Sequence, residues 1–423
     1  MAPTAGTRRT LRYAEARDEV LAAVRPLPAE RVKVAAALRR ALRFDAIAPH
    51  DLPRFRNSSM DGYAVRSADL AGASDATPVS RAVVSVIAAG MDAGALPADG
   101  VVMVMTGAPM PVGADAVVPI EDVITHDDDP TCPEGFARFR APPAAGANVR
   151  EAGRDVRAGD AALAAGRELS PHDLALLVAM GHGEVEVGSV PKVSVFSTGD
   201  ELVEAGEALS SGSIRDSNLP MMRALLEEAH CRVIHATRLE DRADRVAQSI
   251  SWALDESDVV ITLGGISMGA FDPVRMSLDR LGGVEWWRVA MKPGQPQAFG
   301  APRGKLFFGL PGNPASVACV FEALVRPALR KLTGHAALDR PRLPVRLAEA
   351  VESRAGRTDF VRTTLALSDG SWWATPAGDQ TSGHLSPQSR AHALTVIPEA
   401  AARLGPGDAA EALILRWPDA STG

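Results

Sequence analysis

Three short segments of the chain combine glycines with hydroxyl or acidic side chains, and each follows a run of apolar residues. The segments are Ser197–Glu201, Gly264–Asp272 and Pro311–Ser316. Glycines let backbone N–H groups approach a phosphate, and the start of a following helix adds a favourable partial charge. Asp272 could then hold Mg²⁺, because Mg²⁺ prefers a carboxylate together with phosphate oxygens. These residue types favour a site for a phosphate and a metal ion.

Each segment also has a simpler interpretation as a tight turn followed by a solvated cap. For one segment alone, that interpretation is favoured. In an open α/β sheet, however, ligands bind beyond the carboxyl ends of the strands, where turns enter helices. Three such segments at one sheet edge therefore favour function, with the loop Thr262–Asp272 at its centre.

Other polar segments are less specific. The segments Arg56–Tyr63 and Met103–Ala108 could be simple turns, and Lys292–Pro296 places a cation on a rigid loop, where it could bind an anion or be solvated. The histidines show no metal-ligand spacing, and no Ser-His-Asp or Cys-His arrangement is apparent. Covalent catalysis and a zinc site are therefore not expected.

Composition limits the class of protein. The chain has 423 residues, a net charge of -7 and 46% hydrophobic residues, which fits a soluble multidomain enzyme better than a nucleic-acid-binding protein. We expect no signal peptide, because no apolar stretch follows Arg8 and Arg9, and no apolar run is long enough to span a membrane. Cys132, Cys231 and Cys319 are far apart, which is typical of buried or incidental thiols in a reducing cytosol. We therefore expect a cytoplasmic protein without a membrane or nucleic-acid partner.

The first part of the chain predicts a helical domain interrupted by a β-rich insertion. Residues 13–48 predict two helices, the second with an apolar face formed by Val32, Ala35, Ala36, Leu38 and Leu42. Residues 50–145 contain short β-type runs, at Val83–Ala89, Val101–Met105 and Ala116–Ile120. A helix is expected again after Ser170-Pro171. The predicted domains are residues 10–49 with 146–189, and the insertion 50–145.

The second part of the chain predicts an α/β domain followed by a β domain. Across residues 190–334, apolar runs alternate with helical stretches, which indicates a parallel sheet covered by helices. The expected strands are Val193–Phe196, Val233–Ala236, Val259–Leu263 and Leu306–Leu310, and the expected helices are Leu219–Ala229, Ala243–Leu254 and Val274–Leu281. Residues 338–418 return to β-type runs between turn residues, which predicts a C-terminal β-barrel.

A series of motifs, in order and along nearly the whole chain, resembles the molybdopterin molybdotransferases, the MoeA family that includes the E domain of gephyrin. The matching motifs are Asn57–Ala64, Met105–Pro109, Gly113–Val118, Ser197–Leu202, Gly264–Gly269 and Leu310–Pro314. The resemblance implies four domains, including a molybdopterin-binding α/β domain, and an elongated homodimer. It also implies a reaction in which molybdate enters adenylylated molybdopterin with Mg²⁺-dependent loss of AMP. Contacts with other proteins of cofactor assembly are a further expectation.

The resemblance also assigns site residues, in a cleft between the α/β domain of one subunit and the β-rich domain of the other. The catalytic residues implied are Glu201, Asp61, Thr106, Asp155, Asp241 and Lys292. The residues implied to bind the pterin substrate are Thr198, Gly199, Gly264, Gly265, Ser267, Gly269, Arg288, Pro311, Gly312, Asn313, Pro314, Arg362 and Ser382. Asp272 and Glu201 are implied as metal ligands, with Glu201 as the candidate proton carrier.

Two departures from the family pattern bear on anion and metal binding. Gln295 stands where the family loop usually has a second lysine, so one anion-binding charge is absent from this loop. Ala270 stands where relatives often have another acid before the aromatic residue, which leaves Asp272 with fewer acidic partners. Both departures leave room for a specialised paralogue.

Two other functions compete with the transferase. The first is an adenylyltransferase that activates molybdopterin, since such enzymes share the α/β domain, but the additional β domains and the motif Asn57–Tyr63 argue against it. The second is a non-catalytic scaffold of the same fold, but so many acids in the cleft would serve no purpose in a binding protein. ATP-dependent adenylylation without molybdate insertion would decide for the first.

Overall fold

The computed structural model describes residues 9–266 and 273–418, so part of the central loop, including Ser267, Gly269 and Asp272, lies outside the described residues. The chain divides into two compact units. The first comprises Met1–Phe44, Ala165–Ser170 and Val185–Gly423, and the second comprises Asp45–Ala164 and Pro171–Glu184. This division is coarser than the four predicted domains, whose boundaries stay a prediction.

The first unit contains the predicted parallel sheet. Its parallel strands lie in the order β17 (Arg232–Leu239), β14 (Lys192–Thr198), β18 (Val259–Leu263) and β21 (Leu306–Leu310). Every residue of β18 and β21 is buried, as expected for continuous apolar runs covered on both faces. The prediction of these strands is confirmed.

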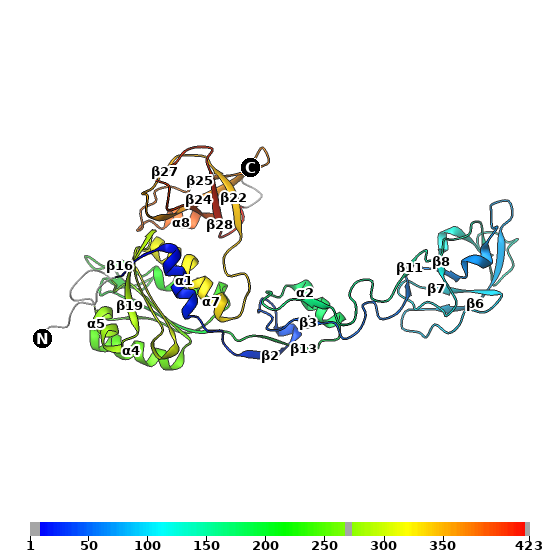
Figure 1. Ribbon diagram of the computed structural model, residues 1–423, viewed down its shortest axis with the longest axis horizontal. Helices are drawn as coiled ribbons and strands as arrows, with labels where there is room; N and C mark the ends of the chain where they lie inside the picture. Colours follow the sequence, from blue (N-terminus) through cyan, green and yellow to red (C-terminus); the bar gives the residue numbers. More distant parts are fainter. Residues whose placement is uncertain (1–8, 267–272, 419–423) are drawn as a thin grey trace. The chain divides into compact units, whose positions relative to one another are not determined.

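Helices cover both faces of this sheet. The three predicted helices are confirmed as α3 (Asn218–Glu228), α4 (Ala243–Glu256) and α5 (Pro273–Leu281). Buried residues of α4 and α5 share one hydrophobic core, and those of α1 (Tyr13–Ala23) and α7 (Arg326–Leu332) share another. Figure 1 shows these two pairs of helices on opposite sides of the sheet. Such a two-sided arrangement leaves the strand ends as the open edge of the domain.

The sheet continues beyond the predicted strands. β20 (Pro296–Gly300) pairs antiparallel with β21, and β19 (Val284–Lys292) pairs antiparallel with β20. β19 also pairs with β24 of the C-terminal β domain, where Lys292 is opposite Asp359. The predicted C-terminal strands are confirmed, as β22 (Arg342–Leu347), β24 (Thr358–Ser368), β25 (Ser371–Pro376), β26 (Ala393–Ile397) and β28 (Ala409–Ile414). The segment Lys292–Pro296 is thus the turn of a hairpin.

The predicted second helix of the N-terminal segment is wrong. After α1, the chain forms the short strand β2 (Ala29–Lys33) and a single 3₁₀ turn (Val34–Ala36). The backbone N–H groups of Leu42 and Arg43 donate to carbonyl oxygens of residues 167 and 186, far along the chain. Tertiary pairing therefore satisfies the backbone groups that a helix would have used, and it overrides local propensity.

The second unit contains the predicted β-rich segment. Its six-stranded sheet has the order β8 (Ala116–Pro119), β5 (Gly62–Val65), β7 (Gly100–Val104), β6 (Val79–Ile87), β10 (Phe136–Phe139) and β9 (Val123–Ile124). Gly62 has no room for a side chain, because a Cβ there would lie 2.2 Å from the carbonyl oxygen of Val118. The helix expected after Ser170-Pro171 is confirmed as α2 (Pro171–Ala179).

Two expectations from composition can be compared with the structure. All three cysteines are buried and free, as predicted. Within residues 9–266 and 273–418, no helix combines the length and the apolar character that a membrane span requires.

Candidate functional site

A cavity of about 860 Å³ lies at the carboxyl ends of β14, β18 and β21, in the first unit. It gathers the loops after all three strands, as the sheet-edge argument predicts. The predicted site residues that line it are Thr198, Gly199, Glu201, Asp241, Gly264, Gly265, Pro311, Gly312, Asn313 and Pro314. The structure therefore brings together most of the residues predicted for the α/β domain.

The glycines after β18 allow very close packing at the floor of the cavity. Gly264 and Gly265 have φ values of 86° and 65°, which side chains rarely tolerate. A Cβ on Gly265 would lie 2.3 Å from the side chain of Val274 and 2.8 Å from Oγ1 of Thr198. Among the described residues, the buried hydroxyls of Thr198 and Thr262 have no hydrogen-bond partner. Thr198 therefore offers a free polar group to a ligand in the cavity it lines.

Carboxylates gather on one wall of the cavity. The backbone N–H of Asp241 donates to Oδ1 of Asp200 at 3.2 Å, and Glu201 lines the cavity beside Asp241. Desolvation at the wall raises the pKa of Asp241, and the charges of Asp200 and Glu201 raise it further. A bound cation would relieve this crowding of negative charge.

The described residues alone do not form a complete metal site. No group of three His, Cys, Asp or Glu side chains in these residues is arranged to hold a metal ion. Mg²⁺ in nucleotide sites nevertheless needs only one or two carboxylates, with phosphate and water oxygens as its other ligands. Glu201 and Asp241 therefore fit a Mg²⁺ ion that a phosphate helps to hold.

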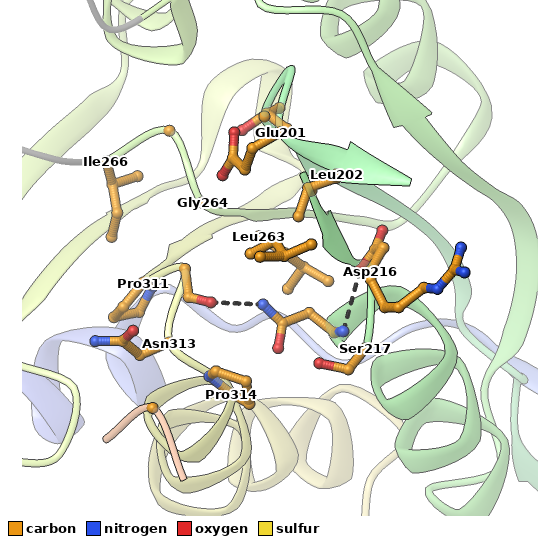
Figure 2. A pocket seen from close by; sticks show the side chains of 18 of the residues that line it. Glu201, Leu202, Asp216, Ser217, Leu263, Gly264, Ile266, Pro311, Asn313 and Pro314 are labelled. Carbon is orange, nitrogen blue, oxygen red and sulfur yellow. Dashed lines mark hydrogen bonds between the residues drawn. The ribbon is translucent and has the colours of Figure 1, made fainter. Parts of the chain in front are cut away.

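The opposite wall is the turn from β21 into α6 (Pro314–Val320). Figure 2 shows Glu201 on one side of the pocket and Asn313 and Pro314 on the other. Nδ2 of Asn313 donates to Oγ of Ser382 at 2.9 Å, and the N–H of Ala315 donates to the Ser382 carbonyl at 3.1 Å. Ser382 does not line the cavity itself but anchors the C-terminal β domain to the turn that does.

Arg362 lies behind this wall rather than in the cavity. Its side chain is 1% exposed and donates to the carbonyl oxygens of Asp379, Thr381 and His384 at 3.3 to 3.5 Å. Its Nε donates to Oε1 of Gln380 at 3.1 Å. The guanidinium therefore holds the loop 379–384 in place, and with it Ser382.

Arg362→Met is expected to lower the free energy of unfolding by about 3 kcal/mol, because a buried guanidinium and the partly buried hydrogen bonds that it donates to several carbonyl groups are lost. Urea denaturation of the purified chain would measure this change. Arg346→Met is the matched control, because Arg346 is exposed in the same β domain and, among the described residues, its side chain donates only to the Gly407 carbonyl. Equal losses in the two variants would contradict the assigned role of Arg362.

The predicted cations Lys292 and Arg288 have a different position. Both belong to β19, both are exposed, and neither lines the cavity. Lys292 ends the strand where it meets the C-terminal β domain.

Sequence reasoning missed one edge of the cavity, which is formed by Arg215, Asp216, Ser217 and Asn218. Oδ1 of Asp216 accepts hydrogen bonds from the N–H groups of Asn218 and Leu219, at 3.0 and 3.1 Å. Nδ2 of Asn218 donates to the Gly312 carbonyl at 2.6 Å, which ties this edge to the turn after β21. The signal was present, since Asp-Ser-Asn before an apolar helix is a typical helix start.

The second unit holds the remaining predicted residues. Oδ1 of Asp61 accepts hydrogen bonds from the N–H of Thr106 at 2.7 Å and from its hydroxyl at 2.9 Å. These two bonds lower the pKa of Asp61, the backbone bond more than the side-chain bond. Asp61 and Thr106 therefore form a hydrogen-bonded pair in which only the carboxylate is charged. Asp155 does not join them but lines a separate cavity of about 600 Å³ in the same unit.

Comparisons with known proteins cover nearly the whole chain. Residues 11–181 match the family described as MoeA N-terminal region (domain I and II). Residues 194–331, which include most of the cavity at the sheet edge, match the probable molybdopterin binding domain. Residues 344–415 match the MoeA C-terminal region (domain IV).

Individual known proteins are also similar to this chain over most of its length. A molybdopterin molybdenumtransferase of Haemophilus influenzae is 37% identical over 338 residues, which cover 80% of this chain and 81% of that protein. A molybdopterin molybdenumtransferase 2 of Mycobacterium tuberculosis is 37% identical over 389 residues, covering 90% and 93%. This chain is also similar to the crystal structure of a molybdopterin biosynthesis moeA protein from Pyrococcus horikoshii OT3, with a TM-score of 0.82 and 26% sequence identity. The similarity covers 96% of this chain and 100% of the Pyrococcus horikoshii chain.

Proposed function

This chain belongs to the MoeA family of molybdopterin molybdenumtransferases, and on that premise we propose that it inserts molybdate into adenylylated molybdopterin and releases AMP. The observation that carries the proposal is the cavity at the carboxyl ends of β14, β18 and β21. It combines a glycine-rich floor, an acidic wall with Glu201 and Asp241, and a helix-entering turn at Asn313. Relatives that share most of the chain's length bear the transferase name, which disfavours the adenylyltransferase.

The glycine-rich floor suits a phosphate. The backbone N–H of Gly265 and the hydroxyl of Thr198 are donors of the kind that bind phosphate oxygens, whereas the N–H of Gly264 already donates to the Leu310 carbonyl at 3.0 Å. Ser267 and Gly269, which were also predicted to bind the pterin substrate, lie outside the described residues. Molybdate, the second substrate, is a tetrahedral dianion, so the exposed cations Lys292 and Arg288 are its proposed binding groups.

The carboxylates of the acidic wall are proposed to bind a metal ion and to transfer protons. Glu201 and Asp272 are the proposed ligands of Mg²⁺, with Asp241 beside them. When bound, Mg²⁺ neutralises phosphate charge and orients water for attack on the phosphoanhydride. The carboxylate of Glu201 also accepts or returns the protons that move when oxo groups leave molybdate, because it lines the cavity.

The cavity at the sheet edge is proposed as only half of the active site. Asp61, Thr106 and Asp155 complete it from the second unit of a partner subunit, so the enzyme acts as a cytoplasmic homodimer. What supports this is the hydrogen-bonded pair of Asp61 and Thr106, whose bonds favour the ionised form of the Asp61 carboxyl in the second unit.

The decisive experiment is to incubate the purified chain with adenylylated molybdopterin and Mg²⁺, with and without molybdate, and to measure free AMP. Release that depends on molybdate supports the proposal. AMP release that is the same without molybdate counts against it, and ATP-dependent formation of adenylylated molybdopterin would identify an adenylyltransferase instead. A parallel assay with tungstate would determine which oxyanion is accepted.

A further inference from the structure

Two arginines line the separate cavity of about 600 Å³ in the second unit. Its lining includes Arg150, Arg154 and Asp155, together with the small or apolar residues Pro53, Ser59, Gly146 and Val149. Both arginines are exposed to solvent. This cavity is built entirely from residues 53–155, so its geometry belongs to one compact unit.

The backbone around both arginines is fixed by hydrogen bonds. Arg150 belongs to β11 (Val149–Arg150), which pairs with β4 (Asn57–Ser58). Arg154 follows Gly153, whose φ of 68° and whose N–H bond to the Pro53 carbonyl at 3.0 Å set a tight turn. A Cβ on Gly153 would lie 3.0 Å from the carboxylate of Asp51, so this turn has little room to change. The two side chains therefore start from defined positions at the cavity wall.

The charges of these arginines are not neutralised by the protein. Glu151 lies between them in sequence, but its carboxylate accepts from Nε of Arg56 at 3.0 Å. Across the described residues, neither Arg150 nor Arg154 has an ion pair or a side-chain hydrogen bond. Guanidinium groups of this kind bind phosphate-like anions through paired N–H donors. The cavity thus presents unpaired donors for an anion.

We propose that this cavity is a second subsite for a tetrahedral oxyanion, held by Arg150 and Arg154, in addition to the anion-binding groups proposed for the first unit. The inference rests on the proposed function, because that reaction offers two sources of such an anion: the molybdate ion and the phosphate of the adenylylated pterin. The carboxylate of Asp155 lines the same cavity and repels an anion that approaches it. The anion therefore binds on the side of the cavity where the two arginines lie.

Binding of inorganic phosphate and of molybdate to the full chain tests the subsite. Titration calorimetry would compare the wild type with Arg150→Gln, Arg154→Gln and the double variant. Loss of one guanidinium is expected to weaken anion binding about tenfold, the equivalent of roughly 1.4 kcal/mol. Arg157→Gln is the matched control, because Arg157 is exposed on the same loop but does not line the cavity. Arg157→Gln should bind phosphate and molybdate as tightly as the wild type does.

Turnover assays distinguish the two sources of the anion. A raised KM for molybdate with an unchanged KM for the pterin assigns the subsite to molybdate, and the reverse assigns it to the phosphate. Thermal unfolding of each variant checks that the fold is retained. Unchanged anion binding in the double variant, or no anion binding by the wild type, would overturn the proposal. Because calorimetry does not require turnover, it gives its answer even if the wild type fails to release AMP with molybdate.

Discussion

Glu201→Gln is expected to reduce molybdate-dependent AMP release by about a hundredfold or more, since a positioned acid–base group contributes roughly 10²–10⁴-fold to a rate. Glutamine keeps the size of the side chain and can still accept a hydrogen bond, but it carries no charge for a metal and takes up no proton. The loss of the proton carrier should appear in kcat when molybdate and Mg²⁺ are saturating, and the loss of a metal ligand should add to it when molybdate and Mg²⁺ are limiting. Asp272→Asn is expected to act in the same direction, through metal binding.

Glu204→Gln is the control for Glu201→Gln. Glu204 is an exposed glutamate three positions further along the chain, just after the short strand β15 (Leu202–Val203), and it does not line the cavity. Its variant should retain the activity of the wild type. Full activity of Glu201→Gln under the same limiting conditions would remove Glu201 from the chemistry. An equal loss in both variants would show that the loop tolerates no change of charge, and would also argue against a specific role.

The parallel strands of the α/β domain were predictable because burial on both faces makes each one a continuous apolar run. β18 and β21 are such runs, with turn residues directly after them. The hairpin of β19 and β20 was not predicted, because the loop Lys292–Pro296 was interpreted for its charge rather than as a turn. Local pattern also failed at Leu42 and Arg43, whose backbone groups pair with distant segments. Such pairing leaves no periodic signal in the sequence.

The candidate site was predictable to a similar degree. Glycine-rich turns at strand ends can be located from sequence, since all strands of a parallel sheet end at one edge. The role of Arg362 could not be inferred, because a buried arginine that binds loop carbonyls has the same sequence signature as one that binds a ligand. The edge at Asp216 and Asn218 was missed because its residues serve as a helix start as well as a cavity wall.

Mixed dimers of Asp61→Asn and Glu201→Gln chains are expected to recover activity that neither variant has alone. If each active site takes Glu201 from one subunit and Asp61 from the other, a mixed dimer has one intact site and one doubly altered site. Random association in a twofold-symmetric dimer then gives about a quarter of the wild-type activity. Both variants should fold, because asparagine can still accept the hydrogen bonds from Thr106 and Glu201 is exposed.

A chain with both substitutions, mixed with the wild type, provides the opposite test. In a shared site each mixed dimer would then have two sites with one defect each, and it would be inactive. In a site formed within one chain, the same mixed dimer would keep one intact site, and the Asp61→Asn and Glu201→Gln mixture would recover nothing. Two affinity tags would isolate the mixed dimers in each case, and AMP release would report their activity. A correctly folded variant that cannot dimerise should be inactive for the same reason, because each chain alone supplies only one half of the site.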